Sequence, residues 1–344
     1  MIFTAFAPCR VDLAGGTLDI WPLYLNHDQA VTVNFALNLY TRAKLTTHAG
    51  PEIHLRALDL SKEESFSNLA ELRDAKQYRL KLLAEAVRWY APEGGFTLET
   101  TSEAPAGAGI SGSSSLLITL GALFNRLTGA KYTIEKIREV AQNIEARVIH
   151  VPTGCQDYYP AMYGGVSAIE LDCAGIRRKE IPLDPAELEA RGVLVYTGEP
   201  RNSGINNWEV TKAYIDGDRK VQKNFAQITA IAVGMRKALE SADWNEAARL
   251  LREEWSFRRK NAPGISTELI DALVAKTRRA GAVGAKVCGA GGGGCVFFLV
   301  EPGTKEKVSR VATELGARVL DFRVAPQGVK VVQGVKVKAS GGAQ

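Results

Sequence analysis

The most informative segment of this 344-residue chain reads Pro105-Ala106-Gly107-Ala108-Gly109-Ile110-Ser111-Gly112-Ser113-Ser114-Ser115-Leu116. Its glycines let the backbone approach a ligand closely and adopt positive φ angles. Its serines open an amphipathic helix predicted over residues 113–127, where unpaired N–H groups and the positive end of the helix dipole favour phosphate. The segment therefore predicts a nucleotide-phosphate site at a loop-to-helix junction, and a plain loop with a serine N-cap is the alternative.

The same segment contains a G-x-G-x-x-G pattern at Gly107, Gly109 and Gly112, which occurs in dinucleotide-binding folds. That fingerprint belongs in a β-α-β unit with an acidic residue about 20 positions further on. Here a second predicted helix, at 133–149, follows the first without an intervening strand. A Walker-type loop is also absent, because no Gly-Lys-Ser/Thr closes the run. A dehydrogenase stays open as an alternative, and an NAD titration would test it.

Hydrophobic patterning around this segment predicts a two-domain α+β protein, with domains at 1–185 and 186–340. The first domain is expected to be a sheet of strands covered by helices, and the order of elements in the second fits a ferredoxin-like sandwich. In the first domain we expect strands at 30–37, 40–47, 52–57, 96–101, 165–171 and near 178–181, and helices at 77–90, 113–127 and 133–149. In the second we expect strands at 192–197, 282–288, 295–300 and near 318–322, and helices within 205–239 and at 244–259, 267–280 and 304–315. The tail at 335–344 is expected to be a frayed strand and disordered end without an assigned function.

Composition excludes several classes of protein. The net charge is only +5, with 46% hydrophobic and 24% charged residues, and the basic residues are scattered, so we expect no nucleic-acid partner. No apolar stretch reaches the roughly 18 residues of a membrane helix. The five cysteines form no C-x-x-C pair, and the first residues lack a charged region followed by a long apolar run. We therefore expect a cytoplasmic protein without a membrane partner, either a monomer or a homodimer.

Two further runs flank the phosphate-loop segment at a distance. One reads Pro8-Cys9-Arg10-Val11-Asp12-Leu13-Ala14-Gly15-Gly16-Thr17-Leu18-Asp19, and the other reads Lys286-Val287-Cys288-Gly289-Ala290-Gly291-Gly292-Gly293-Gly294-Cys295. Four successive glycines between apolar strands are costly in chain entropy, so they usually serve a close backbone approach. A flexible hairpin is the alternative for the second run.

The three runs, taken in order, resemble those of the GHMP kinases, which include galactokinase, homoserine kinase, mevalonate kinase and phosphomevalonate kinase. The resemblance covers nearly the whole chain and is greatest to bacterial sugar kinases of the D-glycero-D-manno-heptose 7-phosphate kinase type. It implies a ribosomal-S5-like N-terminal domain, a ferredoxin-like C-terminal domain and ATP bound between them. It also implies transfer of the γ-phosphoryl group of ATP, with Mg²⁺, to a hydroxyl, expected to be anomeric, of a monosaccharide or sugar phosphate.

The resemblance also assigns roles to residues. Asp157 corresponds to the aspartate that takes the acceptor's proton, and Arg10 to the basic residue beside it. Ser114 and Glu145 would bind Mg²⁺, although an alignment without a gap moves the metal role to Ser113. The ATP phosphates would be wrapped by Pro105, Gly107, Ala108, Gly109, Ile110, Ser111, Gly112, Ser113, Ser114 and Ser115. The acceptor side would be formed by Gly16, Thr17, Asp19, Gly291, Gly292 and Gly293.

One departure from the family falls in the expected acceptor pocket. Heptose phosphate kinases usually read A-G-G-G-T-D where this chain reads Ala14-Gly15-Gly16-Thr17-Leu18-Asp19. Because the change at Leu18 affects the expected acceptor pocket, the identity of the sugar stays open. Two other functions also stay open: a sensor of the same fold that binds sugar and nucleotide without catalysis, and a kinase for a non-sugar alcohol such as mevalonate.

Overall fold

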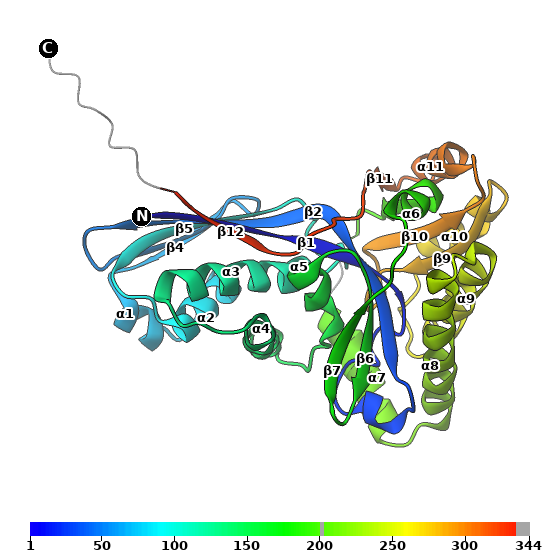
Figure 1. Ribbon diagram of the computed structural model, residues 1–344, viewed down its shortest axis with the longest axis horizontal. Coiled ribbons are helices and arrows are strands. Elements are labelled where there is room, and N and C mark those ends of the chain that lie inside the picture. The colour runs from blue at the N-terminus through cyan, green and yellow to red at the C-terminus, as the bar shows by residue number, and fades with distance from the viewer. Residues whose placement is uncertain (200–202, 335–344) are drawn as a thin grey trace, which may run out of the picture.

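The computed structural model describes residues 1–199 and 203–334, so the predicted tail at 335–344 lies outside the described residues. Two sheets, each covered by helices, form the molecule, as the sequence predicted (Figure 1). The larger sheet has eight strands, and six of them run in the order β12-β1-β2-β5-β3-β4. The remaining two extend it beside β2, because β6 pairs with β2 and β7 pairs with β6. Its strands are β1 (Ile2–Ala14), β2 (Val31–His48), β3 (Ile53–Ala57), β4 (Lys62–Phe66), β5 (Gly95–Ser102), β6 (Val166–Asp172), β7 (Gly175–Glu180) and β12 (Lys330–Gly334).

Helices cover one face of the long part of this sheet (Figure 1). The central one, α3, packs on β1 and β2 and begins directly after the glycine-rich loop. The next helix begins after Thr133, whose side chain accepts a hydrogen bond from the Lys136 amide at 3.2 Å, which confirms the predicted N-cap. The helices of this half are α1 (Leu69–Asp74), α2 (Lys81–Tyr90), α3 (Gly112–Thr128), α4 (Ile134–Ile149) and α5 (Tyr159–Tyr163), with 3-10 turns η1 (Leu23–Asn26) and η2 (Gln156–Tyr158).

The second sheet is antiparallel, in the order β11-β8-β10-β9. In chain order this is 4-1-3-2, the arrangement of a ferredoxin-like sandwich. Its strands are β8 (Gly192–Tyr196), β9 (Ala282–Val287), β10 (Cys295–Val300) and β11 (Arg318–Leu320). Its helices are α6 (Pro185–Arg191), α7 (Ser203–Ile215), α8 (Arg219–Glu240), α9 (Trp244–Arg258), α10 (Glu268–Arg278) and α11 (Lys305–Glu314).

The observed elements differ from the predicted ones in several places. The strands predicted at 30–37 and 40–47 are one continuous strand, β2, which bends where its pairing with β1 shifts register. The helix predicted at 77–90 begins only at Lys81. Strand β12 falls within the predicted second domain, yet it pairs with β1 in the first sheet. The chain therefore returns to its first half at its end, and the division at 185/186 stays a prediction.

The two halves share a buried apolar core. Val11 and Phe35 of the first sheet pack in one cluster with Met235 of α8 and Phe297 of β10, and the rings of Phe35 and Phe297 lie 5.4 Å apart. Because burial of this shared surface fixes the two halves against each other, loops from both can build one site at their junction.

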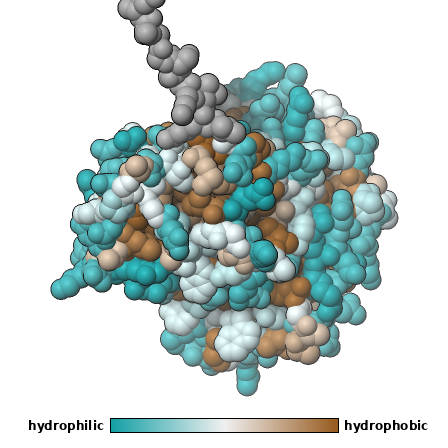
Figure 2. Space-filling model, turned by 60° about the vertical axis from the view of Figure 1, so that its left-hand side comes forward, coloured by the Kyte–Doolittle hydropathy of each residue, from teal (hydrophilic) through white to brown (hydrophobic). Residues whose placement is uncertain are grey.

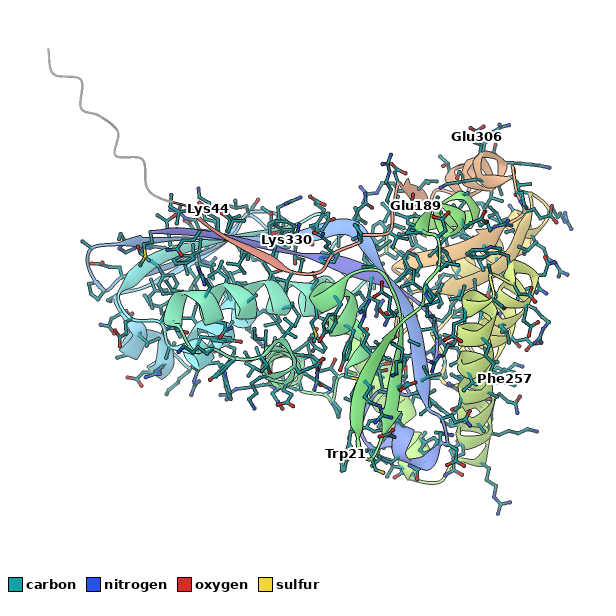
Figure 3. The ribbon with its side chains drawn as sticks, viewed as in Figure 1. Trp21, Lys44, Glu189, Phe257, Glu306 and Lys330 are labelled. Atoms are coloured by element: carbon teal, nitrogen blue, oxygen red, sulfur yellow. The ribbon has the colours of Figure 1, made fainter. Side chains whose placement is uncertain are left out.

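The outer surface is mixed. On the face shown in Figure 2, apolar residues form separate patches between hydrophilic ones. Trp21 lies at the outer end of the β1–β2 connection and is 68% exposed (Figure 3). Within residues 1–199 and 203–334, no helix has the length and apolar character needed to cross a bilayer.

Candidate active site

A cavity of about 440 Å³ lies at the junction of the two halves. Most of the predicted site residues line it, and they come from loops that are distant in sequence. The lining includes Arg10, Gly16, Thr17, Asp19, Pro105, Gly107, Ala108, Gly109, Ile110, Ser111, Gly112, Ser113, Glu145 and Asp157. The second half contributes Asn207, Gly289 and Ala290.

The loop before α3 leaves the first turn of the helix available to a ligand. Ser111 is the N-cap residue, but its φ of +58° is left-handed and its side chain does not cap the helix. Its hydroxyl donates instead to the Ile110 carbonyl at 2.8 Å. Gly112 and Ser113 line the cavity directly after it. Free N–H groups and the positive end of the helix dipole therefore lie at the cavity wall, where they can bind phosphate.

The three serines of the helix start play different structural roles. Ser113 lines the cavity, and its hydroxyl donates to Glu145. Ser114 is 1% exposed, and its hydroxyl donates to the same carboxylate at 2.8 Å. Ser115 faces the sheet and donates to the Ala7 carbonyl at 3.0 Å. Ser114 and Ser115 are thus not part of the cavity wall, although both were predicted to wrap the phosphates.

Glu145 is a buried carboxylate at the edge of the phosphate loop. Besides the two serines, the Tyr158 hydroxyl donates to it at 2.5 Å. Burial raises the pKa of Glu145 above its usual value, and hydrogen bonds from Ser113, Tyr158 and Ser114 partly oppose this effect. A buried carboxylate beside hydroxyl groups is an oxygen-donor set that suits a hard cation. No group of three acidic, histidine or cysteine side chains suited to a metal occurs in the described part of the chain.

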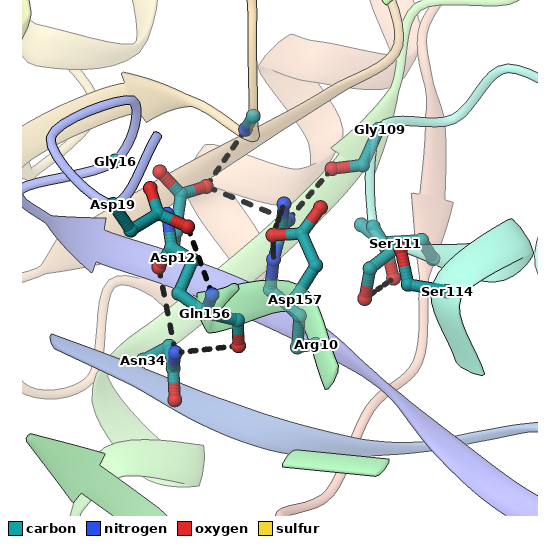
Figure 4. Close-up of polar contacts among 12 residues, drawn as sticks. Arg10, Asp12, Gly16, Asp19, Asn34, Gly109, Ser111, Ser114, Gln156 and Asp157 are labelled. Atoms are coloured by element: carbon teal, nitrogen blue, oxygen red, sulfur yellow. Dashed lines mark hydrogen bonds and ion pairs between the residues drawn. The ribbon is translucent and has the colours of Figure 1, made fainter. Parts of the chain in front are cut away.

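Arg10 joins the phosphate loop to the predicted base. Its guanidinium donates to Asp157 through Nε at 3.0 Å and Nη2 at 2.6 Å, and to the Gly109 carbonyl through Nη1 at 2.8 Å (Figure 4). Its backbone amide donates to the Ile110 carbonyl at 3.0 Å. Burial alone would lower the pKa of Arg10, but Asp157 and Asp12 raise it above its usual value, so the guanidinium stays charged.

Asp19 lies in the same wall as Asp157. Its carboxylate accepts a hydrogen bond from the backbone amide of Gln156 at 2.8 Å (Figure 4). Burial, together with the charge of Asp157, raises the pKa of Asp19 to about 7. The Asp19 carboxyl can therefore carry a proton near neutral pH and donate a hydrogen bond to an acceptor molecule.

The raised pKa of Asp19 predicts a pH effect on stability. Because the native state binds this proton more tightly than the unfolded chain, whose aspartates titrate near pH 4, stability falls as the pH rises from about 4 to about 7. Asp19→Asn removes this titration but keeps an oxygen for the Gln156 amide. The difference in denaturation midpoint between the Asp19→Asn variant and the wild type should therefore grow in favour of the variant across that range. A difference that does not change with pH would contradict the raised pKa.

Asp12 and Lys286 form a buried ion pair behind the cavity that the sequence did not single out. Both side chains are 0% exposed, and Lys286 Nζ donates to the Asp12 carboxylate. The Gly289 amide donates to the same carboxylate at 2.7 Å. Burial would raise the pKa of Asp12, but Lys286 and Arg10 lower it below its usual value. One feature of the sequence could have indicated Asp12: it lies two residues after Arg10 in β1, and alternation along a strand places both side chains on the same face.

The four successive glycines of the second half, residues 291–294, support the phosphate loop from outside the cavity. Gly291, Gly292 and Gly293, predicted on the acceptor side, do not belong to the cavity wall; Gly289 and Ala290 do. The Gly292 amide donates to the Ile265 carbonyl at 2.8 Å. At Gly294 (φ +79°), a Cβ atom would lie 2.6 Å from the Ala108 carbonyl oxygen. Glycine is needed there because the two loops touch through their backbones.

The acceptor-side loop differs from the prediction at one residue. Gly16, Thr17 and Asp19 line the cavity. Leu18 is 0% exposed and packs in the apolar core of the second half, so the prediction that the change at Leu18 affects the acceptor pocket directly is wrong. The residue that lines the cavity at this departure from the family pattern is Thr17.

Comparison with known proteins gives matches in both halves. Residues 77–165 match the model of the GHMP kinases N terminal domain, and residues 235–318 match that of the GHMP kinases C terminal domain. The chain is 27% identical over 337 residues to the D-glycero-alpha-D-manno-heptose 7-phosphate kinase of Campylobacter jejuni, covering 94% of this chain and 96% of that protein. It is 30% identical over 249 residues to the mevalonate kinase of Thermococcus gammatolerans, covering 69% of each.

Solved structures of the same fold are also similar. A D-glycero-D-manno-heptose 1-phosphate kinase from Bacteroides thetaiotaomicron superposes with a TM-score of 0.75 at 24% sequence identity, covering 97% of this chain and 99% of that one. This likeness supports the two-domain α+β fold.

Proposed function

Because the chain belongs to the GHMP kinases, a family of ATP-dependent kinases with hydroxyl acceptors, we propose that it phosphorylates a sugar or sugar phosphate. The observation that carries the proposal is the placement of Arg10, which contacts both Asp157 and the carbonyl of Gly109 in the phosphate loop. The likeness to a heptose 7-phosphate kinase over nearly the full chain favours a sugar as the acceptor. The anomeric hydroxyl is the proposed position. A cytoplasmic location and a monomeric or homodimeric state remain predictions from the sequence.

Phosphoryl transfer depends mainly on alignment and on neutralising the charge of the moving group. In the proposed complex, the N–H groups at the start of α3 and the loop before it hold the triphosphate. Asp157 orients the acceptor hydroxyl and takes its proton. Arg10 holds the Asp157 carboxylate in place through two hydrogen bonds and stabilises charge that develops between the acceptor oxygen and the phosphorus.

Mg²⁺ is part of the proposal, and the oxygen donors at Glu145 fit it. Mg²⁺ in such sites is held by one or two carboxylates together with substrate phosphates and water, which agrees with a single carboxylate there. We assign the accompanying hydroxyl to Ser113, since it lines the cavity whereas Ser114 is buried. The left-handed φ of Ser111 supports the same assignment. A positive φ is typical of glycine, and an alignment without a gap pairs Ser111 with the second glycine of the family's loop and Ser113 with its metal-binding serine. The ion would neutralise charge on the phosphates.

Glu145→Gln should weaken the metal dependence of nucleotide binding. The amide keeps an acceptor for the serine hydroxyls but removes the negative charge, so the Mg²⁺ concentration needed for half-maximal binding of an ATP analogue should rise at least about tenfold. Calorimetric titrations over a range of Mg²⁺ concentrations measure this. Glu139→Gln, on the same helix but exposed and paired with Lys136, is the matched control and should behave as wild type. An unchanged Mg²⁺ requirement in Glu145→Gln would remove Glu145 from the metal site.

A screen for acceptor-dependent ADP release tests the function. Hexoses, heptose phosphates, uronic acids and deoxysugars would be offered with ATP and Mg²⁺, and NMR of the product would fix the phosphorylated position. The 30% identity to a mevalonate kinase supports a second candidate acceptor, so mevalonate belongs in the same screen. ADP release with a sugar supports the proposal. ADP release with mevalonate and with no sugar would instead identify a mevalonate kinase. Tight binding of sugar and nucleotide without release would identify a sensor.

A further inference from the structure

The acceptor loop, residues 15–19, has a conformation that its own sequence does not favour. Thr17 has a φ of +73°, a left-handed value at which a β-branched residue is an outlier. Two turn hydrogen bonds define the loop: the Leu18 amide donates to the Gly15 carbonyl at 3.1 Å, and the Ile20 amide to the Thr17 carbonyl at 3.1 Å. Such a conformation persists only where the surroundings hold it, and outliers of this kind concentrate at functional sites.

Arg258, the last residue of α9, holds this loop from the other half of the molecule. Its Nη2 donates to the Gly16 carbonyl at 2.7 Å, and its Nη1 donates to the Thr17 hydroxyl at 3.2 Å. Its Nε donates to Glu254 at 2.8 Å, one turn earlier on the same helix. Arg258 is 3% exposed and Glu254 is 0% exposed. The guanidinium is thus fixed by a buried ion pair and is aimed at the loop, not at the cavity.

A second contact from the same half completes the arrangement. The Thr17 hydroxyl donates to Asn207 Oδ1 of α7 at 3.2 Å, while it accepts from Arg258. Helices of the C-terminal half therefore use the proton of the hydroxyl and one of its two acceptor positions. Where heptose phosphate kinases usually have glycine, this chain has a threonine, and its side chain anchors the loop.

The position of the loop is coupled to the acceptor wall. At Gly16, a Cβ atom would lie 2.9 Å from Asp12 Oδ2 and 2.9 Å from Gln156 Nε2, so the loop lies directly against both residues. The backbone amide of Gln156 in turn donates to the Asp19 carboxylate. A shift of the loop would therefore displace Asp19 from its partner next to Asp157.

We propose that Arg258 is a positioning residue for the acceptor: acting through Gly16 and Thr17, it lets helices α7 and α9 of the C-terminal half set the affinity for the phosphoryl acceptor. The effect on acceptor affinity rests on the proposed kinase function. The hydrogen bonds by which Arg258 holds residues 16 and 17 do not depend on it. The hydrogen bonds of the Arg258 side chain go to Glu254, Gly16 and Thr17 and not to the phosphate loop or Asp157, so we expect nucleotide binding to be independent of it.

Hydrogen–deuterium exchange of the whole protein without ligands tests the structural link. In Arg258→Met, the amides of Leu18 and Ile20 should exchange at least about tenfold faster, because the two hydrogen bonds that the charged guanidinium donates to the loop are lost. Peptides from α3 should be unchanged. Arg249→Met is the matched control, since Arg249 lies on the same helix and pairs with Glu253, four residues away, but is exposed. Unchanged exchange of the loop in Arg258→Met would overturn the proposal.

Two milder variants keep the test decisive if Arg258→Met does not fold. Arg258→Lys keeps the positive charge beside Glu254. A single ammonium group cannot reproduce the geometry in which two guanidinium nitrogens donate to Gly16 and Thr17 at once. Thr17→Val removes the hydroxyl that links α7 and α9 without changing any charge. In both variants, the amides of residues 15–20 should exchange faster than they do in Arg249→Met. A loop as protected as that of the wild type in both variants would also overturn the proposal.

Steady-state kinetics distinguish a positioning role from a general effect on stability, because only the former changes the KM for the acceptor without changing the KM for ATP. With an acceptor that the wild type phosphorylates, Arg258→Lys and Thr17→Val should raise the KM for that acceptor about tenfold and leave the KM for ATP within about twofold. An equal rise in both KM values, or a fall in kcat alone, would contradict the positioning role. If the wild type turns over no acceptor at all, the proposed function fails, and the exchange experiment still decides whether Arg258 holds the loop.

Discussion

Replacing Asp157 with asparagine is expected to lower kcat by about 10²–10⁴-fold while leaving the affinity for a Mg²⁺–nucleotide analogue within about threefold of wild type. The asparagine side chain keeps an oxygen that can accept the hydrogen bonds from Arg10, so the phosphate loop keeps its contact with that guanidinium. It cannot take the proton of the acceptor hydroxyl. The loss should therefore appear in turnover and not in nucleotide binding.

The measurement pairs steady-state kinetics with calorimetric binding of the nucleotide analogue. Asp172→Asn is the control, because Asp172 is an exposed carboxylate paired with Arg177 and should affect neither quantity. Turnover of Asp157→Asn near the wild-type rate would eliminate Asp157 as the base. An equal loss of nucleotide binding would instead assign Asp157 to the architecture of the loop.

Lys286→Met is expected to lower the free energy of unfolding by about 3–5 kcal/mol. Lys286 and Asp12 are both fully buried, and the substitution leaves the Asp12 carboxylate without its nearest cation in the interior. Arg10, at 3.6 Å, is shared with Asp157 and offsets only part of this loss. Urea denaturation followed by intrinsic tryptophan fluorescence measures the change.

The double variant Asp12→Asn/Lys286→Met separates charge burial from packing. It removes both charges while keeping similar shapes, so it should recover much of the lost stability. Lys44→Met is the surface control, because Lys44 is half exposed and lies 3.7 Å from Glu99; its effect should stay below about 1 kcal/mol. A small effect in Lys286→Met, similar to that of the control, would show that the buried pair is not needed for the fold.

Local patterns predicted those parts of the fold that local physics determines. The start of α3 and the Thr133 cap of α4 depend on residues within one helical turn, so the sequence alone was sufficient. The pairing of β12 with β1 joins the two ends of the described chain, and nothing in either strand specifies a partner that distant. The continuity of β2 was missed because a register shift bends the strand and interrupts its alternation.

Some residues of the candidate site could likewise be identified from the sequence, and others could not. The family resemblance identified Arg10, Asp157, Asp19 and Glu145, and all four line the cavity. It could not distinguish between Ser113 and Ser114, since their difference lies in burial, which only the packing of α3 against α4 determines. Asp12, Lys286 and Arg258 were not identified, because each acts through a partner on another element.

A crystal structure with Mg²⁺, a non-hydrolysable ATP analogue and the acceptor found in the screen tests the central claim most directly. The account predicts the triphosphate against the backbone amides of the loop before α3 and of its first turn, with the acceptor hydroxyl within hydrogen-bonding distance of Asp157 and in line with the γ-phosphorus. A triphosphate bound elsewhere, or an acceptor hydroxyl out of reach of that carboxylate, would contradict it.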